Sequence, residues 1–362
     1  MAGFDLKEGR YEERIMSDDE MWLALSCVFS SKSRNDTSYK YGFLKALLDN
    51  LYNVDENLKL TFDQVFSKFG EIYWNLILKH GLKQKASTND ERQSYLEQVL
   101  YSAAKKYNIV EAIAYESLTA DMMIDISHQV KMKCKKYVVG ALFEDTRRIF
   151  YSFSKKEEYI QFNPGMYEFV CKHKVVIEKL NYYEWARFLE RVNEEKNTVR
   201  LLDKIDESAK RNNLSYYRNL LFNEFEVHNC FYCGKPLRPD RIDVDHFIPW
   251  SYVANDELWN LIPMDENLNS SKNNKLPDWD AYYKKFCDNQ YILNETIQTN
   301  EKAREKFEKC KQHNLNSIWP LEELYIQKIE KERFFNVLYG RLHPIYESAM
   351  TQGYDIWKNC LI

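Results

Sequence analysis

Apolar residues recur at three- and four-residue spacing through most of the first hundred positions, which is the period of amphipathic helices. One such run covers 62–77 and stops shortly before Gly81, a residue type that favours the left-handed turn after a helix. Another run follows Ser17, whose hydroxyl can cap the first turn of a helix. The pattern therefore predicts a helical bundle over about 17–107.

The pattern changes at 137–162, where short runs of β-branched and aromatic residues alternate with charged turns. We expect a two- or three-stranded β-ribbon there. Lysines crowd the preceding stretch, 131–136, and two interpretations stay open: a winged-helix-like DNA reader, or a solvated lysine face beside a small structural sheet. Helical periodicity then resumes. The charged stretch that ends at Asn197 is the best candidate for a domain boundary, and it divides the chain into domains 1–197 and 198–362.

Composition indicates two globular domains with ordinary cores. The chain has 362 residues, of which 44% are hydrophobic and 29% charged. Its net charge of -4 excludes a surface that is positively charged overall, so any contact with nucleic acid must come from local basic patches. Of the eight cysteines only Cys230 and Cys233 form a close pair, which is typical of reduced thiols. Because the chain shows no signal peptide and no membrane span, we expect a cytoplasmic protein without membrane contact.

The clearest chemical pattern is the stretch Asp-Val-Asp-His-Phe-Ile-Pro at 243–249, which is followed by Asn260 and Asn269. Hydrolysis of a phosphodiester needs an activated water, a cation beside the scissile phosphate and a fixed line of attack. Asp245 offers a hard oxygen ligand, and the imidazole of His246, with an ordinary pKa of ~6.5, suits a general base near neutral pH. Adjacent strand residues point to opposite faces, so both can serve one site only where the strand ends or turns.

Three blocks of residues resemble the active site of HNH endonucleases, also called the ββα-metal or His-Me finger family. The blocks are 243–249, 258–263 and 267–272, and the resemblance extends over about 228–280. Their spacing is similar to that of the HNH domain in RNA-guided CRISPR nucleases, where an asparagine closes the motif. The resemblance implies a β-hairpin followed by a helix that returns the last ligand to the site.

The resemblance also implies a role for each matching residue. His246 would be the general base, and Asp245 and Asn269 would be ligands of one Mg²⁺ or Mn²⁺ ion. Asn260 would brace the loop that carries the histidine, and Lys272 would contact a phosphate of the bound strand. Residue by residue, the plainer alternative is a strand-end carboxylate that holds a structural histidine, with the two asparagines as helix caps.

The resemblance is incomplete where many HNH proteins hold zinc. Those relatives carry two Cys-x-x-Cys pairs, and this chain has the first of them at Cys230 and Cys233. Asp265 and Leu268 stand where the second pair is often found, and leucine cannot bind a metal. A structural Zn²⁺ at the cysteines stays an alternative, but we expect the pair to carry none.

These observations predict an α+β, mainly α-helical protein, with a helical N-terminal domain that includes the β-ribbon and a C-terminal ββα-metal domain wrapped by helices. The predicted function is a metal-dependent endonuclease acting on DNA, and similarity to restriction and phage-defence nucleases implies that role in bacteria. Alternatives are a binding module with an inactive nuclease fold and an RNA-directed nuclease toxin. An enzyme with one active site per chain cuts both DNA strands only if two chains act together or one chain acts twice. A homodimer, or a complex with a partner protein, is therefore a further expectation.

Overall fold

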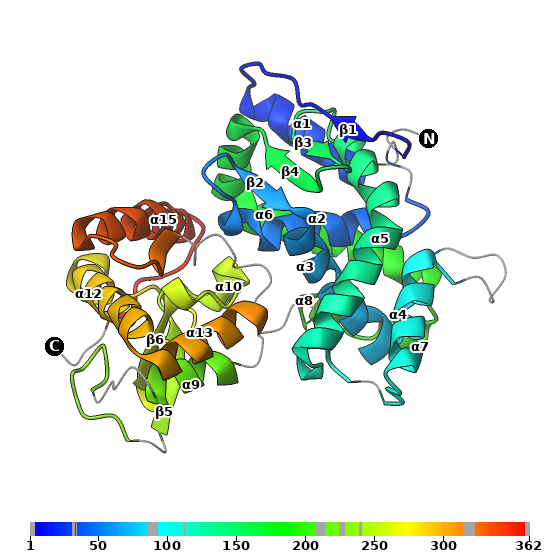
Figure 1. The fold of residues 1–362 in the computed structure, drawn as a ribbon. Coiled ribbons are helices and arrows are strands. Elements are labelled where there is room, and N and C mark those ends of the chain that lie inside the picture. Colours follow the sequence, from blue (N-terminus) through cyan, green and yellow to red (C-terminus); the bar gives the residue numbers. More distant parts are fainter. Residues whose placement is uncertain are drawn as a thin grey trace. The chain divides into compact units, whose positions relative to one another are not determined.

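The computed structural model describes residues 4–30, 33, 35–85, 93–111, 113–207, 214–223, 229–238, 241–313 and 323–358. The chain divides into two compact units, Met1–Lys210 and Arg211–Ile362 (Figure 1). The described part of the first unit has a four-stranded sheet and that of the second a two-stranded sheet, amid many helices. The predicted α+β, mainly helical class is confirmed. No described helix is long and apolar enough to cross a membrane.

Helices dominate the first unit and surround its small sheet. Its elements are β1 (Glu8–Gly9), α1 (Asp18–Phe29), α2 (Tyr39–Asp49), η1 (Leu51–Asn53), β2 (Lys59–Thr61), α3 (Phe62–Trp74), η2 (Asn75–Lys79), α4 (Tyr95–Lys106), η3 (Tyr115–Ser117), α5 (Ala120–Asp145), β3 (Tyr151–Ser154), β4 (Tyr159–Phe162), α6 (Pro164–Val192), α7 (Glu195–Thr198) and α8 (Leu201–Asp206). The central helix is α3, which packs against α2 and α5.

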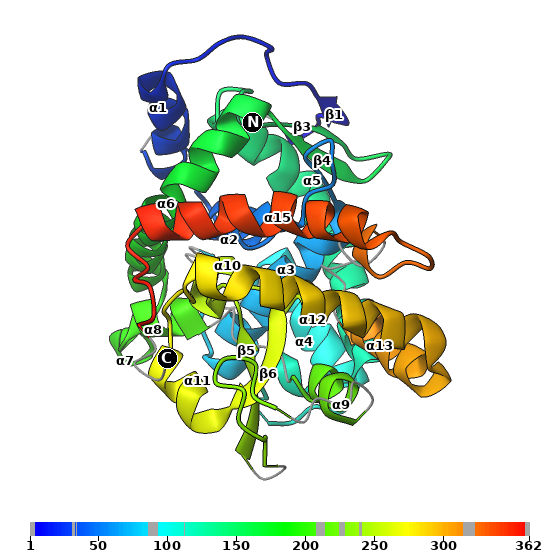
Figure 2. The ribbon, with the colours of Figure 1, turned by 90° about the vertical axis from the view of Figure 1, so that its left-hand side faces the viewer.

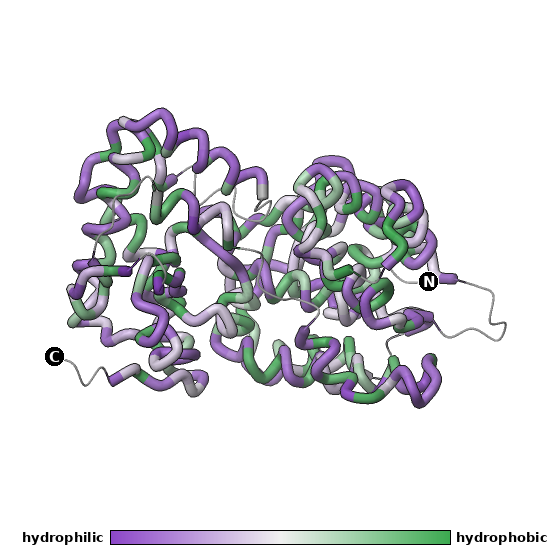
Figure 3. Tube along the Cα trace, turned by 90° about the horizontal axis from the view of Figure 1, so that it is seen from below, coloured by the Kyte–Doolittle hydropathy of each residue, from purple (hydrophilic) through white to green (hydrophobic). Residues whose placement is uncertain are grey.

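Local signals set the ends of these helices as the sequence predicts. Ser17 caps α1, because its hydroxyl accepts a hydrogen bond from the amide of Glu20 and the Glu20 carboxylate accepts one from the amide of Ser17. The apolar run at 62–77 forms α3 and continues into the π-helical turn η2, after which Gly81 adopts a φ of 65°. Apolar and polar segments alternate along the helices of both units (Figure 3), as the sequence periodicity requires.

The ribbon is shorter than the predicted 137–162, because the first part of that stretch is helical. Val138, Val139 and Leu142 are fully buried on α5, so burial outweighs the strand preference of the valines. The hairpin of β3 and β4 lies in a sheet of order β1-β3-β4-β2, and its Tyr151 hydroxyl donates to the Val139 carbonyl at 2.6 Å.

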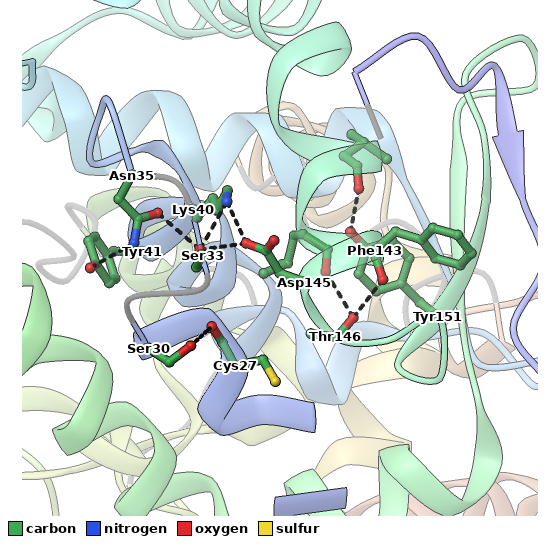
Figure 4. A network of polar contacts seen from close by, with 12 residues as sticks. Cys27, Ser30, Ser33, Asn35, Lys40, Tyr41, Phe143, Asp145, Thr146 and Tyr151 are labelled. Atoms are coloured by element: carbon green, nitrogen blue, oxygen red, sulfur yellow. Dashed lines mark hydrogen bonds and ion pairs between the residues drawn. The ribbon is translucent and has the colours of Figure 1, made fainter. Parts of the chain in front are cut away.

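The loop before α2 is fastened to the end of α5 through Asp145 (Figure 4). The hydroxyl of Ser33 donates to the Asp145 carboxylate at 2.6 Å, and the ammonium of Lys40 pairs with the same carboxylate oxygen. Next to it the hydroxyl of Thr146 donates to the carbonyl of Leu142 at 2.9 Å and ends the helix. These contacts hold the loop before α2, α2 and the end of α5 together.

Two of the four lysines before the ribbon, Lys131 and Lys135, are neutralised by carboxylates. Lys131 pairs with Asp63 at 2.6 Å and with Glu158 at 2.7 Å, and Lys135 pairs with Glu158 at 2.5 Å. A cation that is already paired has less attraction left for a phosphate. The structure therefore favours the interpretation of a structural sheet over that of a winged-helix reader.

The two units divide later than the predicted boundary after residue 197. Helix α8 packs against α6 of the first unit, with Leu201 and Ile205 buried. These apolar side chains attach a segment to the first unit that the charge pattern assigned to the second.

A buried charged cluster joins α2 and α6. Lys45 pairs with Asp49 and, at 3.1 Å, with Glu178, and Lys174 lies 3.8 Å from the same glutamate. Burial raises the pKa of Glu178, but the ammonium groups of Lys174 and Lys45 outweigh it and lower the pKa to about 2. The carboxylate therefore stays charged through the acidic range.

We expect Glu178→Gln to destabilise the protein at neutral pH by about 3–5 kcal/mol, because Lys45 and Lys174 lose a counter-charge that they share inside the fold. The native protein should lose stability as pH falls below the ordinary glutamate pKa of 4.5 toward 2, since a carboxylate with a lowered folded pKa stabilises only while ionised. In the variant this loss should be smaller. Urea unfolding at several pH values measures both effects, with Glu190→Gln, an exposed position on α6, as control. Equal pH dependence in variant and native protein would contradict the assignment.

The second unit contains a hairpin flanked by long helices. Its elements are α9 (Ser215–Asn223), β5 (Ile242–His246), α10 (Trp250–Val253), η6 (Leu258–Asn260), β6 (Leu261–Asp265), α11 (Glu266–Lys272), α12 (Trp279–Thr299), α13 (Glu301–His313) and α15 (Lys331–Thr351). Helices α12 and α15 lie side by side (Figure 2). Helix α12 contributes to the core behind the hairpin through Phe286, whose ring lies 4.3 Å from that of Phe247.

Candidate active site

The three motif blocks fold into a β-hairpin and a short helix. Strand β5 pairs antiparallel with β6, with Asp245 opposite Ile262 and His246 opposite Leu261. Helix α11 follows β6 directly and packs on both strands. Its first turn is capped by Asp265, whose carboxylate accepts hydrogen bonds from the amides of Asn267 and Leu268. This is the ββα arrangement that the motif predicts.

Asp245 is buried, and both of its carboxylate oxygens have partners. The hydroxyl of Tyr232 donates to one oxygen at 2.8 Å, and the ammonium of Lys272 donates to the other at 3.0 Å. Burial, and after it the neighbouring Asp245 carboxylate, raises the pKa of Tyr232 well above its usual range, so that this hydroxyl remains a donor. Asp245 thus has a fixed orientation.

Lys272 lies inside the unit, and the expectation that it contacts a phosphate of a bound strand needs correction. Its side chain is fully buried, and its ammonium also donates to the main-chain carbonyl of His246 at 2.8 Å. Lysine extends far enough from α11 to reach the end of β5, where the Asp245 carboxylate stabilises its charge. In this position the lysine supports the end of β5 from within.

Asn269 forms a hydrogen bond with Asp243 and not with Asp245, the residue with which the resemblance implies that it shares a cation. Its amide nitrogen donates to Asp243 at 2.6 Å, and Arg218 donates to the other oxygen of Asp243 at 3.0 Å. The side chain of Asp243 is 33% exposed, in contrast to that of Asp245 at 5%. Side chains two apart on a strand share a face, as do those three apart on a helix, so α11 aligns Asn269 with Asp243 and Lys272 with Asp245.

His246 is held by a residue that the sequence motif does not include. Its Nε2 lies 2.8 Å from the carboxylate of Asp256, and both side chains are 2% exposed. Its Nδ1 is buried and has no hydrogen-bond partner among the described residues. Since a carboxylate accepts, Nε2 carries the proton and Nδ1 has the free lone pair.

Asp256 escaped the sequence analysis because an acidic residue in a loop, ten positions after a histidine, is too common to single out. The loop is fastened to α9, because the hydroxyl of Tyr217 donates to the main-chain carbonyl of Asp256 at 2.8 Å. Only the folded chain brings the carboxylate to the imidazole.

Asn260 bridges the start of β6 to the turn after His246. Its amide nitrogen donates to the carbonyl of Ile248 at 2.9 Å, and its amide oxygen accepts from the amide of Ile248 at 2.8 Å. The main-chain carbonyl of Asn260 also accepts from the amide of Phe247 at 2.8 Å. The fully buried side chain has the geometry of the brace that the resemblance implies.

A family model of HNH endonucleases matches residues 230–278, the segment that carries β5, β6 and α11. The C-terminal region of the chain contains an HNH nuclease domain. The match begins at Cys230 and includes every motif residue considered above, and Asp256 lies within the same segment. Comparison with curated proteins and with solved structures gives no match for the chain.

The cysteine pair of the HNH domain lies in a tight turn before the hairpin. Cys230 and Cys233 are free thiols, and burial raises the pKa of Cys230. Asp265 and Leu268, which occupy the places of the missing second pair, line the same pocket as the two cysteines. Within the described ranges, no three His, Cys, Asp or Glu side chains are grouped to hold a metal ion.

We therefore expect the purified protein to hold much less than one zinc ion per chain, because a tetrahedral site needs four ligands and the turn supplies two. Elemental analysis of native protein and of Cys230→Ser measures this. Stoichiometric zinc in the native protein that the substitution removes would contradict the expectation.

Proposed function

We propose that this protein is a metal-dependent endonuclease that hydrolyses phosphodiester bonds in DNA. The observation that carries the proposal is the buried pair of His246 and Asp256 at the end of the strand that also presents Asp243 and Asp245. A base and a set of oxygen ligands on neighbouring positions are what metal-assisted hydrolysis requires. Similarity of the motif to restriction and phage-defence nucleases supports a role in bacterial defence, in the cytoplasm.

The proton movement in this mechanism is local to His246. Asp256 accepts the Nε2 proton and orients the ring, which leaves Nδ1 as the proton acceptor. Nδ1 takes a proton from the attacking water as the water oxygen bonds to phosphorus, and the P–O bond to the departing oxygen breaks, with its electron pair going to that oxygen. Asn260 holds the turn on which the imidazole depends, through its two bonds to Ile248.

The residues present fit a divalent cation by their chemistry. Asp243, Asp245 and Asn269 bring carboxylate and amide oxygens, the ligands that Mg²⁺ and Mn²⁺ prefer, to one face of β5. Asn269 uses its amide nitrogen on Asp243, which leaves its amide oxygen for the cation. We propose Asp245 and Asn269 as ligands, with the more exposed Asp243 beside them. Asp245 would keep its bonds to Tyr232 and Lys272 and bind the ion through a remaining lone pair of its carboxylate. A bound ion would neutralise charge on the scissile phosphate and the departing oxygen.

Chelation is expected to abolish cleavage, and added Mg²⁺ or Mn²⁺ should restore it. Supercoiled plasmid DNA and labelled RNA, digested side by side with and without EDTA, test the metal and the substrate together. Binding of Mn²⁺ in the absence of nucleic acid, followed by electron paramagnetic resonance, should weaken in Asn269→Ala. Full activity in EDTA would refute the metal-dependent mechanism, and cleavage of RNA alone would favour the toxin interpretation.

Asp256→Asn should lower kcat by about 10²-fold while KM stays within about twofold, because the amide no longer fixes the imidazole proton on Nε2 but leaves the substrate surface unchanged. Asp256→Glu, which keeps the carboxylate, should recover part of the loss. Steady-state nicking kinetics measure both constants, and Asp280→Asn on the exposed face of α12 is the control. A loss confined to KM would assign Asp256 to substrate binding instead.

A further inference from the structure

A pocket of about 610 Å³ lies beside the hairpin and gathers three cationic side chains, Lys235, Arg238 and Arg241. All three are exposed, and none makes an ion pair within the part of the chain that the structure describes. The opposite wall is formed by the start of α11, with Asn267 and Leu268. We call this the basic pocket.

The basic pocket has an excess of positive charge in a chain with a net charge of -4. Among the described residues that line it, Asp265 is the one carboxylate, and that group already accepts hydrogen bonds from two amides of α11. Some lysines in other places are neutralised by a neighbour, as Lys131 is by Asp63. Three like charges around one hollow repel each other, and an anion that binds among them relieves the repulsion.

We propose that the basic pocket binds a backbone phosphate of the nucleic-acid strand that the HNH domain cuts. This inference rests on the proposed function and names the surface that holds its substrate. Guanidinium groups bind phosphate through two parallel hydrogen bonds, and two of the three cations are arginines. A non-scissile phosphate held there would fix the register of the strand.

Position along the elements supports a phosphate near the cut. Arg241 stands two residues before Asp243 on the approach to β5, and Asn267 stands two residues before Asn269 on α11. Two strand residues span about 6.6 Å. The basic pocket thus lies along the same two elements that carry Asp243 and Asn269.

Binding of a fluorescently labelled DNA duplex by the full chain tests this, with cleavage blocked by His246→Ala. In that background, the combined variant Lys235→Gln, Arg238→Gln and Arg241→Gln should bind about tenfold or more weakly at about 0.1 M salt. Its plot of log affinity against log salt should be flatter by about one unit, because one phosphate contact is lost. Lys284→Gln, Lys302→Gln and Lys309→Gln remove the same charge from exposed positions on α12 and α13 and should bind as the background does.

The outcomes separate this inference from the proposed function. If both sets of substitutions weaken DNA binding equally, the proposal for the basic pocket is wrong, because the change in net charge alone would then explain the loss of affinity. Unchanged affinity in the pocket variant would also overturn it, while cleavage by the native chain would leave the nuclease assignment in place. If the background protein binds no DNA, and the native chain cuts none, both proposals are wrong. Stoichiometric zinc on Cys230 and Cys233 would contradict the proposal for the basic pocket but would leave the proposed function in place.

Discussion

Substitution of His246 by alanine is expected to lower the rate of DNA cleavage by about 10²–10⁴-fold. The reason is that Nδ1 of this imidazole is the proton acceptor in the proposed mechanism, while Asp256 holds Nε2. The measurement is the initial rate of plasmid nicking at saturating Mg²⁺. His128→Ala, an exposed histidine of α5, removes the same side chain from the other unit and should leave the rate unchanged.

Loss of a buried side chain can also unfold a protein, so His246→Gln is a necessary companion to the alanine variant. Glutamine keeps a polar group within reach of Asp256 but cannot act as a base near neutral pH. Both variants should bind DNA. The free energy of unfolding of each should lie within about 2 kcal/mol of that of the native protein. Cleavage at the native rate by folded His246→Gln would remove the histidine from the mechanism.

Lys272→Met is expected to destabilise the second unit by about 3–5 kcal/mol, because it leaves the buried Asp245 carboxylate without its counter-charge. Methionine fills a similar volume, so the charge is the main change. Urea unfolding measures the difference in free energy of unfolding. Lys275→Met, an exposed lysine one turn along, should change stability by less than about 0.5 kcal/mol.

The double variant Asp245→Asn with Lys272→Met separates the ion pair from other effects. If the pair is the cause, the double variant should be more stable than Lys272→Met alone, since no unpaired buried charge remains. If Lys272→Met instead has native stability but binds DNA more weakly, Lys272 contacts a phosphate of the bound strand, as the resemblance implies.

Local patterns predicted much of the helical fold because they act over short distances. The capping box at Ser17 and the turn at Gly81 involve residues within one helical turn of each other, so the sequence shows both partners. The ribbon was misjudged at its start because valines suit a strand or a buried helix, and only packing against α3 favours the helix at 137–145. The unit boundary depends likewise on the burial of α8 against α6.

The sequence by itself determined the chemistry of the candidate site, because an HNH motif is a matter of residue types at fixed spacing along 243–272. Only the tertiary structure decided which groups meet: Asp256 with His246, Asn269 with Asp243, and Lys272 with Asp245. Each pair joins residues at least ten positions apart, and whether a charge is buried or open depends on everything packed around it. Spacing along a chain specifies neither burial nor the partner across a loop, and these settle which residues can carry a proton, a cation or a phosphate.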